Sequence, residues 1–273
     1  MSALTSIDPI LADLRSPDLS RRIAALLSLK EEPQRAARGG TLEALIENLD
    51  SPSKAIQRRA ADVLAAAAAD SPAVVARVAA LLDAPQPRVR WIAAYVLGQV
   101  DGALDLRAAY TLLEAFAADD GDVRWAALEL LVRRGGCYRD AIRERLLMLA
   151  GNPDPNCRKM SLYALRELGI FDPAAVALVC AACGSADSQV RLAALSFLKQ
   201  AGAGSRDAVD AVAECLKSDR DRGVRRAAAF TLGYLGNRST RVLQLLREAA
   251  QTPDDASLSK AARWTLDRLK EER

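Results

Sequence analysis

Apolar and polar positions along this chain recur with a period of about 34 residues. The clearest copy begins Val-Arg-Trp at Val89, and related or weaker copies begin at Leu19, Ile56, Val123, Cys157, Val190, Val224 and Leu258. A near-constant period of this length is typical of solenoids, in which each unit buries its apolar face against its neighbours. Eight such units fill the chain, so we predict a single repeat domain over residues 1–273.

Each unit contains two apolar segments of helical period, separated by Pro, Gly, Asp and Ser, which end helices and form turns. We therefore predict a pair of helices per unit. The second helices are expected to begin near residues 19, 56, 89, 123, 157, 190, 224 and 258. The first helices are expected at residues 7–14, 41–49, 72–82, 106–117, 139–150, 173–183, 206–216 and 240–250, with 31–40 the least regular segment.

A short polar residue stands three positions before most starts of a second helix. A side chain there can accept the unpaired backbone N–H groups of the first turn, and a carboxylate also suits the positive end of the helix dipole. We therefore predict helix N-caps at these positions, namely Asp120, Asp154, Asp187, Asp221, Asp255, Ser16 and Ser53.

The recurring pattern Asp-x-x-Val-Arg-x-x-Ala-Ala-x-x-Leu-Gly resembles the HEAT repeat, and most closely the HEAT-like variety first named from phycobilin lyases. The resemblance covers essentially the whole chain, and it is best from Asp83 to Gly236. It implies an all-α fold, a right-handed α/α superhelix of about eight helix pairs. First helices would lie on the convex side and second helices on the concave side. HEAT-like proteins serve as scaffolds, adaptors, chaperones and occasionally enzymes, so the resemblance alone does not define a function.

A helical wheel separates the two faces of each second helix, at 100° per residue from its starting residue, taken as position 0. Positions 0, 4, 7, 8 and 11 share one side and are mostly apolar, so we predict that they form the core. One unit contributes Val89, Ala93, Val96, Leu97 and Val100, and another contributes Val190, Ala194, Phe197, Leu198 and Ala201.

Positions 2 and 6 lie opposite the core, and we call them the outward stripe. Aromatic residues make up 4% of the chain, yet they fill six of these 16 positions. Aromatic side chains interleaved with Arg and Lys are typical of a binding surface. The alternative is that the rings pack between repeats. The candidate binding residues are Arg58, Trp91, Tyr95, Trp125, Glu129, Lys159, Tyr163, Arg226, Phe230, Lys260 and Trp264.

Five successive units carry arginine at position 1, a set that we call the arginine ladder: Arg90, Arg124, Arg158, Arg191 and Arg225. One interpretation is a row of phosphate-binding side chains. Position 1 lies beside the core, however, and turn carboxylates such as Asp120, Asp154 and Asp187 recur near it. We therefore favour a structural role, with each arginine bonding a turn between adjacent repeats.

Composition narrows the chemistry further. The formal net charge is only +3, so any nucleic-acid or membrane binding would depend on a local patch. Histidine is absent, which excludes Ser-His-Asp and Cys-His catalysis and every histidine-containing metal site. The metal site of HEAT-like deoxyhypusine hydroxylases, built on His-Glu pairs, is excluded with them.

The chain has five cysteines, an odd number, which suits a reducing compartment. Its N-terminus has neither a secretion signal nor a membrane span. We therefore expect a cytoplasmic protein. The motif from Cys180 to Cys183 lies late in a first helix, so we interpret both residues as small core side chains rather than zinc ligands. Cys157 takes an anchor position and is expected in the core. No metal or cofactor is expected.

The function that we predict is a non-catalytic scaffold or adaptor that binds a partner protein or peptide on its concave surface. Trp125 and Glu129 with Lys159 and Tyr163 faintly resemble the cleft of HEAT-like alkylpurine DNA glycosylases. A lyase or chaperone of the phycobilin-lyase type is a further alternative, since an aromatic groove with Arg and Lys could hold a tetrapyrrole. The first alternative implies a nucleic-acid ligand, and the second implies a pigment.

Overall fold

The computed structural model describes residues 8–271, and among these residues it contains α-helices and short 3-10 helices but no strand. Its internal contacts divide the chain between Tyr138 and Arg139 into two compact units. Residues 1–7 lie outside the described part, and they include Ile7, the expected start of the first helix. The single domain expected over residues 1–273 stays a prediction.

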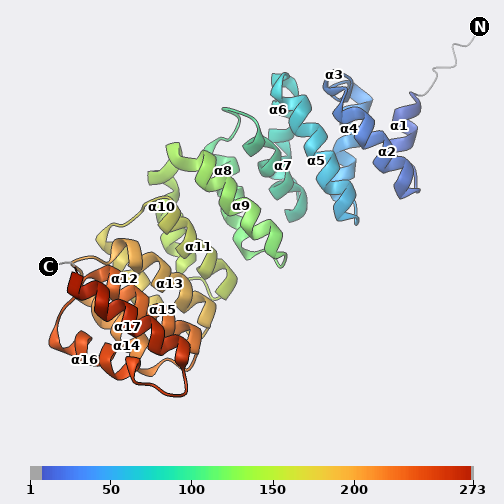
Figure 1. Ribbon diagram of the computed structural model, residues 1–273. Helices are drawn as coiled ribbons and strands as arrows, with labels where there is room; N and C mark the ends of the chain where they lie inside the picture. The colour runs from blue at the N-terminus through green and yellow to red at the C-terminus, as the bar shows by residue number, and fades with distance from the viewer. Residues whose placement is uncertain (1–7, 272–273) are drawn as a thin grey trace, which may run out of the picture. The chain divides into compact units, whose positions relative to one another are not determined.

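The first unit contains four helix pairs, and its second helices α2, α5, α7 and α9 pack one against the next (Figure 1). Short 3-10 turns extend three of its first helices. In chain order the elements are α1 (Pro9–Leu14), α2 (Leu19–Lys30), α3 (Pro33–Ala36), α4 (Gly39–Glu47), η1 (Asn48–Asp50), α5 (Lys54–Ala69), α6 (Pro72–Ala79), η2 (Ala80–Asp83), α7 (Pro87–Gln99), α8 (Leu106–Glu114), η3 (Ala115–Ala117), α9 (Gly121–Arg134) and η4 (Gly135–Tyr138).

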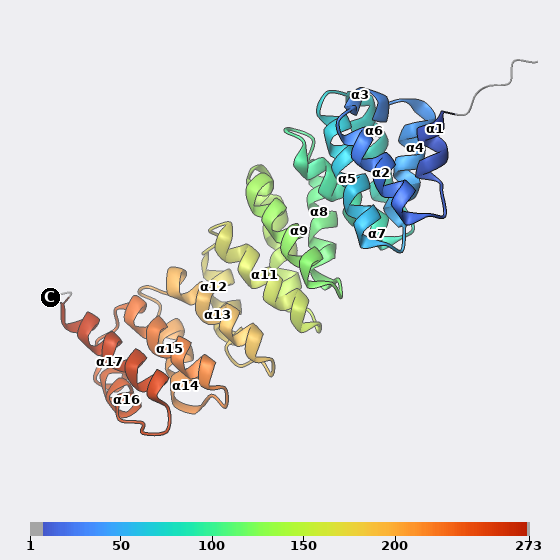
Figure 2. The same cartoon turned by 45° about the vertical axis from the view of Figure 1, so that its right-hand side comes forward.

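The second unit contains four more pairs. Its second helices α11, α13, α15 and α17 follow one another in a row (Figure 2), and its first helices α10, α12, α14 and α16 form the other layer. The elements are α10 (Arg139–Ala150), α11 (Pro155–Glu167), α12 (Pro173–Ala182), α13 (Ser188–Ala201), α14 (Arg206–Ser218), α15 (Arg222–Leu235), α16 (Thr240–Ala250) and α17 (Ala256–Glu271).

Aspartate caps begin the second helices from α9 onward. The carboxylates of Asp120, Asp154, Asp187 and Asp221 each accept a backbone N–H in the first turn of the helix that follows. Asp255 accepts the N–H of Leu258 at 3.0 Å in the same way. These caps confirm the prediction for all five aspartates.

The two serine caps were predicted wrongly. Ser53 takes the N-cap position of α5, but its side chain makes no capping bond. Ser16 is not the cap of α2, because Asp18 caps this helix through the N–H of Ser20 at 2.8 Å. The predicted start at Leu19 is therefore the first residue of the helix, whereas the starts predicted for later units are the third residue. This two-residue shift buries Ala25, which the wheel placed outward, and exposes Leu27.

The predicted first helices match the structure, with α10 and α16 having the expected ends. The segment 31–40 was expected to be irregular, but it contains α3 and the first residues of α4. Pro33 at the first turn of α3 explains why a helix forms there, since proline has no N–H to leave unpaired.

The predicted core positions are buried, with two exceptions. Val89, Ala93, Val96 and Leu97 are all at most 7% exposed. Position 11 is only half-buried, at Val100 and Ala201, because the helices end there.

Glycine and threonine bring successive second helices close together. A Cβ atom on Gly98 would lie 3.1 Å from the Leu130 side chain, and one on Gly233 would lie 3.0 Å from Thr265. The buried hydroxyl of Thr265 donates to the carbonyl of Ala229 at 2.9 Å. The missing side chain therefore permits a close approach, which a hydrogen bond then fixes.

Candidate functional site

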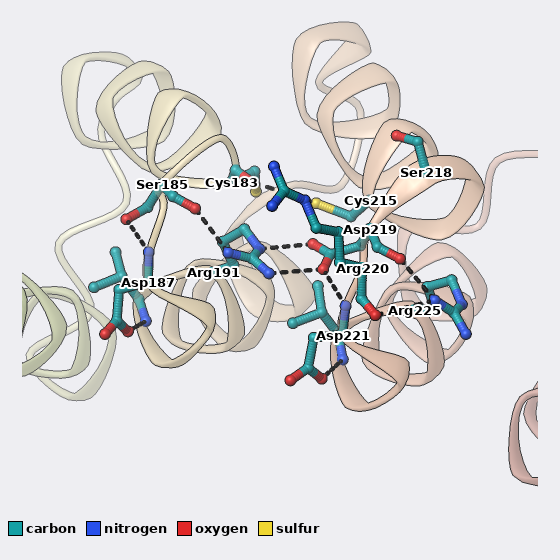
Figure 3. Close-up of polar contacts among 12 residues, drawn as sticks. Cys183, Ser185, Asp187, Arg191, Cys215, Ser218, Asp219, Arg220, Asp221 and Arg225 are labelled. Carbon is teal, nitrogen blue, oxygen red and sulfur yellow. Dashed lines mark hydrogen bonds and ion pairs between the residues drawn. The ribbon is translucent and has the colours of Figure 1, made fainter.

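Arg191 shows how the arginine ladder is built (Figure 3). Its Nη1 donates to the carbonyls of Ser185 and Ala186, at 2.8 and 3.0 Å, in the turn before its own helix. Its Nε and Nη2 donate to the two carboxylate oxygens of Asp219 at 2.6 and 2.7 Å. The side chains are 13% and 5% exposed, so the pair lies inside the protein between consecutive repeats.

Arg90 and Arg225 repeat this bonding, whereas Arg124 and Arg158 have fewer partners. Arg225 donates to the carbonyl of Asp219 at 2.7 Å and pairs with Asp255 at 3.4 Å. Arg90 donates to the carbonyl of Ala84 at 3.1 Å and pairs with Glu114. Arg124 donates to the carbonyls of Ala118 and Asp119, and Arg158 to the hydroxyl of Ser185.

These partners differ from those predicted. Asp120, Asp154 and Asp187 were expected to pair with the ladder, but each uses its carboxylate to cap its own helix. Figure 3 shows the same division of roles around Arg191 and Asp219, with Asp187 and Asp221 bonded at the helix starts. The ladder carboxylates come instead from the first helix or the turn of the next repeat.

Asp219 is ionised in this setting. Burial alone would raise its pKa, but the hydrogen bonds from Arg191 and from the N–H of Asp221 outweigh burial, so the pKa lies below its ordinary value. Arg90, Arg191 and Arg225 thus bond both turn carbonyls and carboxylates, Arg124 bonds turn carbonyls, and Arg158 bonds the Ser185 hydroxyl.

The second unit carries a groove of about 730 Å³ on the outward faces of α13, α15 and α17. Four residues of the outward stripe that were predicted to bind line it, together with Leu192 and small side chains. The lining residues are Leu192, Gly223, Arg226, Ala227, Phe230, Ser257, Lys260, Ala261 and Trp264.

The floor of this groove is aromatic. The rings of Phe230 and Trp264 meet edge to face, with centroids 5.3 Å apart and an interplanar angle of 64°. Trp264 is nevertheless 41% exposed. Packing between repeats therefore covers these rings only in part, and a usable apolar surface is left.

The sequence analysis missed a further aromatic residue beside the groove. Tyr234 is 39% exposed, and its ring centroid lies 6.0 Å from that of Trp264. Lys199 Nζ lies 4.0 Å from the Tyr234 centroid and the guanidinium of Arg268 lies 4.7 Å from it. Tyr234 follows Phe230 by four residues, so extending the stripe from positions 2 and 6 to position 10 would have found it.

Lys159 and Tyr163, the other predicted binding residues of this unit, are not among the groove-lining residues. Tyr163 is half-buried, its ring lies 5.2 Å from the Arg166 guanidinium, and burial raises its pKa. These two residues form a separate surface on α11.

The first unit carries a larger groove, of about 1090 Å³, along α5, α7 and the start of α9. It includes the predicted residues Arg58, Trp91 and Tyr95, and the two rings meet edge to face with centroids 5.8 Å apart. Charges of both signs line it, which the stripe alone did not predict: Lys54, Arg59, Arg88, Glu114, Asp119, Asp120 and Asp122. Lys54 pairs with Asp120 at 2.5 Å, from α5 to the N-cap of α9.

Trp125 and Glu129 lie on α9 and are exposed, but they do not line this groove. Trp125 is 53% exposed, and Glu129 lies 3.9 Å from Arg133 one turn later. Of the residues named for the glycosylase resemblance, Trp125 and Glu129 belong to α9 of the first unit, and Lys159 and Tyr163 belong to α11 of the second.

Three cysteines lie near the α12–α14 contact. Cys183 and Cys215 are buried, whereas Cys180 is half-buried. The neighbouring Cys215 thiol and burial raise the pKa of Cys183, and Cys157 is buried with a raised pKa as well. No group of three metal-ligating side chains is found within residues 8–271, and no helix in this range is long and apolar enough to cross a membrane.

Comparison with solved structures places this architecture among known ones. YibA from Escherichia coli superposes with a TM-score of 0.60 at 19% identity, over 94% of this chain and 99% of YibA. A chain from the structure of Kap95p bound to RanGDP gives a TM-score of 0.63 at 17% identity, over 95% of this chain but only 40% of that chain. Human deoxyhypusine hydroxylase covers 96% of this chain and 94% of its own at 18% identity, with a TM-score of only 0.40.

The sequence itself matches the profile of the family described as HEAT repeats, over residues 42–132, 110–199 and 178–267. A search of curated protein sequences finds no significant match. The fold is the expected all-α repeat fold of about eight helix pairs, four in each unit. This chain belongs to the HEAT-repeat family.

Proposed function

We propose that this protein is a non-catalytic scaffold that binds a partner protein or peptide on the outward faces of its second helices. The groove of the second unit supports this proposal most directly, because it combines a partly exposed aromatic floor with Arg226 and Lys260. Aromatic residues and arginine are the side chains that most often dominate the binding free energy of protein interfaces.

The bonding of the arginine ladder supports the same conclusion. Four of its five guanidinium groups, all but that of Arg158, bond turn carbonyls, and three of these four also bond carboxylates, which favours a structural role over a row of phosphate-binding cations. The Kap95p structure adds a parallel, since a protein with this kind of fold binds another protein there, RanGDP. The residues behind the nucleic-acid alternative line neither groove: Trp125, Glu129, Lys159 and Tyr163. A pigment lyase would use the same aromatic groove as the scaffold, so the purified protein has to be checked for a bound coloured ligand.

Capture from native lysate on the immobilised protein tests the proposal. We expect the wild type to retain a defined polypeptide after nuclease treatment. Trp264→Ala or Trp91→Ala should reduce recovery by about tenfold or more, as truncation of an interface anchor does. Met148→Ala is the matched control, because Met148 is 70% exposed but lies on the first helix α10. Circular dichroism should show unchanged helicity in all three variants.

Three outcomes would contradict this proposal, either in its binding surface or in its class of ligand. Capture that is equal in all variants would place binding elsewhere on the protein. Retention of nucleic acid that is lost with the tryptophans and with rising salt would favour the nucleic-acid alternative. A coloured ligand on the purified protein would favour the lyase or chaperone alternative.

A further inference from the structure

We propose that the groove of the second unit binds an acidic peptide segment that carries a large apolar side chain. This inference rests on the proposed scaffold function and adds the chemistry of the partner. It follows from the floor of the groove, from its charges and from their spacing.

The apolar part of the ligand is set by the floor. Leu192, Ala227, Phe230, Ala261 and Trp264 leave a concave apolar surface at the junction of three helices. A leucine or aromatic side chain seated there would remove apolar surface from water on both partners, which is the main favourable contribution to such association.

The acidic part is set by Arg226 and Lys260. Both side chains are exposed, and neither has an ion-pair or hydrogen-bond partner among the contacts of the described residues. Among residues 8–271, no carboxylate lines this groove. In contrast, acidic residues line the groove of the first unit, and one of them, Asp120, already forms an ion pair with Lys54. Arg226 and Lys260 can therefore attract a ligand carboxylate without having to break an existing ion pair.

The spacing links the two parts. Arg226 precedes Phe230 by four residues on α15, and Lys260 precedes Trp264 by four on α17. Residues four apart lie on the same helix face about 5–6 Å from each other. Two cations therefore lie one turn away from two aromatic rings on neighbouring helices. A ligand that fits must carry its acidic and apolar groups at a similar separation, as an amphipathic peptide does.

The next helix argues against a nucleic-acid strand. A strand spaces its phosphates along its length and binds to a continuing row of cations. On α13 the corresponding outward residues are Leu192 and Ser196, which are uncharged, so the pair of Arg226 and Lys260 is not continued at the same position on that helix. The cation that α13 does place beside the groove, Lys199, lies against the Tyr234 ring, with Nζ 4.0 Å from the ring centroid. In the edge-to-face contact of Phe230 and Trp264, the edge of one ring also covers a face of the other, which leaves less ring surface for base stacking.

Fluorescence anisotropy with labelled synthetic peptides tests this inference on the full-length protein. The first peptide carries Glu and Leu on opposite faces of a helix, each at intervals of three or four residues. The second has Lys in place of Glu, and the third has Ser in place of Leu. We expect the wild type to bind the Glu-Leu peptide about tenfold or more tightly than either of the others. An oligothymidine of similar length serves as the nucleic-acid probe.

A double charge reversal, R226E/K260E, should weaken binding of the Glu-Leu peptide by about tenfold or more and make the Lys-Leu peptide the preferred ligand. The matched control is K217E/R247E, which makes the same change in net charge on α14 and α16. Both control residues are exposed and belong to first helices. This control should change affinity by less than about threefold. Circular dichroism checks that both variants are folded.

Four results would overturn the inference. They are equal binding of the Lys-Leu peptide by the wild type, equal weakening by K217E/R247E, no change in R226E/K260E, and tighter binding of oligothymidine through the same residues. If a partner captured from lysate through Trp264 nevertheless proves to be basic, the scaffold stands and only the acidic chemistry fails. If neither these peptides nor any lysate polypeptide binds, both proposals fail.

Discussion

Asp219 joins two consecutive turns of the second unit through one residue. Its carboxylate accepts two bonds from Arg191 and one from the N–H of Asp221 at 2.9 Å, and its carbonyl accepts from Arg225. Removing one partner of a buried ion pair leaves an uncompensated charge, which costs far more than the loss of an exposed pair. The arginine ladder should therefore matter mainly for stability.

We expect Asp219→Asn to lower the free energy of unfolding by about 3 kcal/mol, because Arg191 loses its charged partner inside the protein. The control is Asp210→Asn, which breaks the exposed pair with Arg241 and should cost less than about 1 kcal/mol. Urea denaturation at neutral pH measures both changes, and equal costs would refute a special role for the buried pair.

The same variant has a pH signature. The pKa of Asp219 is lowered by folding, so the stability that its charge contributes is present above the unfolded pKa of about 4 and is lost as pH falls below it. The difference in unfolding free energy between wild type and Asp219→Asn should therefore shrink as pH falls from 5 toward 2. A difference that stays constant would mean that the charge is not what stabilises this turn.

Sequence reasoning reached different depths for different residues. Outward positions could be predicted for Arg226, Phe230, Lys260 and Trp264 because helical period alone fixes the direction of a side chain. The partner of Arg191 could not be predicted, since Asp219 lies 28 residues away in the next repeat and several nearer carboxylates compete. Selection among these depends on turn geometry that sequence spacing does not encode.

At the scale of the elements, capping explains which helix starts could be predicted. Asp187 accepts the N–H groups of Gln189 and Val190 at 2.8 and 3.0 Å and so satisfies two of the unpaired donors of α13. Ser53 takes the same place before α5 but makes no such bond. The same position thus contributes differently in different repeats.

Asp187→Ala should lower the free energy of unfolding by about 1 kcal/mol, because two N–H groups lose their acceptor. Ser53→Ala is the matched control and should cost less than about 0.5 kcal/mol, since no capping bond is lost. Thermal and urea denaturation measure both variants. A larger effect at Ser53 than at Asp187 would show that the capping bonds do not stabilise these helices.

Element boundaries could be predicted well in the regular repeats but not in the N-terminal region. Where Asp, Val-Arg and Ala-Ala recur at fixed spacing, as in α9, α13 and α15, each feature checks the others. Near α2 the pattern retains only Ser-Pro-Asp, and a cap at Ser16 or at Asp18 fits the sequence equally well. The wheel then inherits a two-residue error, which is why Leu27 rather than Ala25 is exposed.

At the scale of the whole molecule, contacts between neighbouring repeats decide how far a local perturbation spreads. Stability in a repeat array is approximately a sum of repeat and nearest-neighbour contributions. The internal contacts of this chain group into two units, and the boundary between them in the sequence falls between Tyr138 and Arg139. We therefore expect the units to open separately rather than in one cooperative step.

Leu64→Ala tests this expectation. Leu64 is fully buried on α5, and its truncation should cost about 2–5 kcal/mol within the first unit. Hydrogen exchange measured by mass spectrometry should then be faster by about tenfold or more in peptides from α2 to α8 and nearly unchanged in those from α13 to α17. Leu198→Ala, at a fully buried site on α13, should give the reverse pattern.

Equal acceleration in both units would instead show one cooperative domain, as the unbroken repeat predicts for residues 1–273.

The same measurement can show which groove holds an acidic ligand, because the two grooves differ in charge. If the units open separately, a ligand in the second groove should slow exchange only in α13 to α17, through the stabilisation that binding confers on the folded state. Protection confined to those helices would assign the acidic ligand to that unit without any mutation.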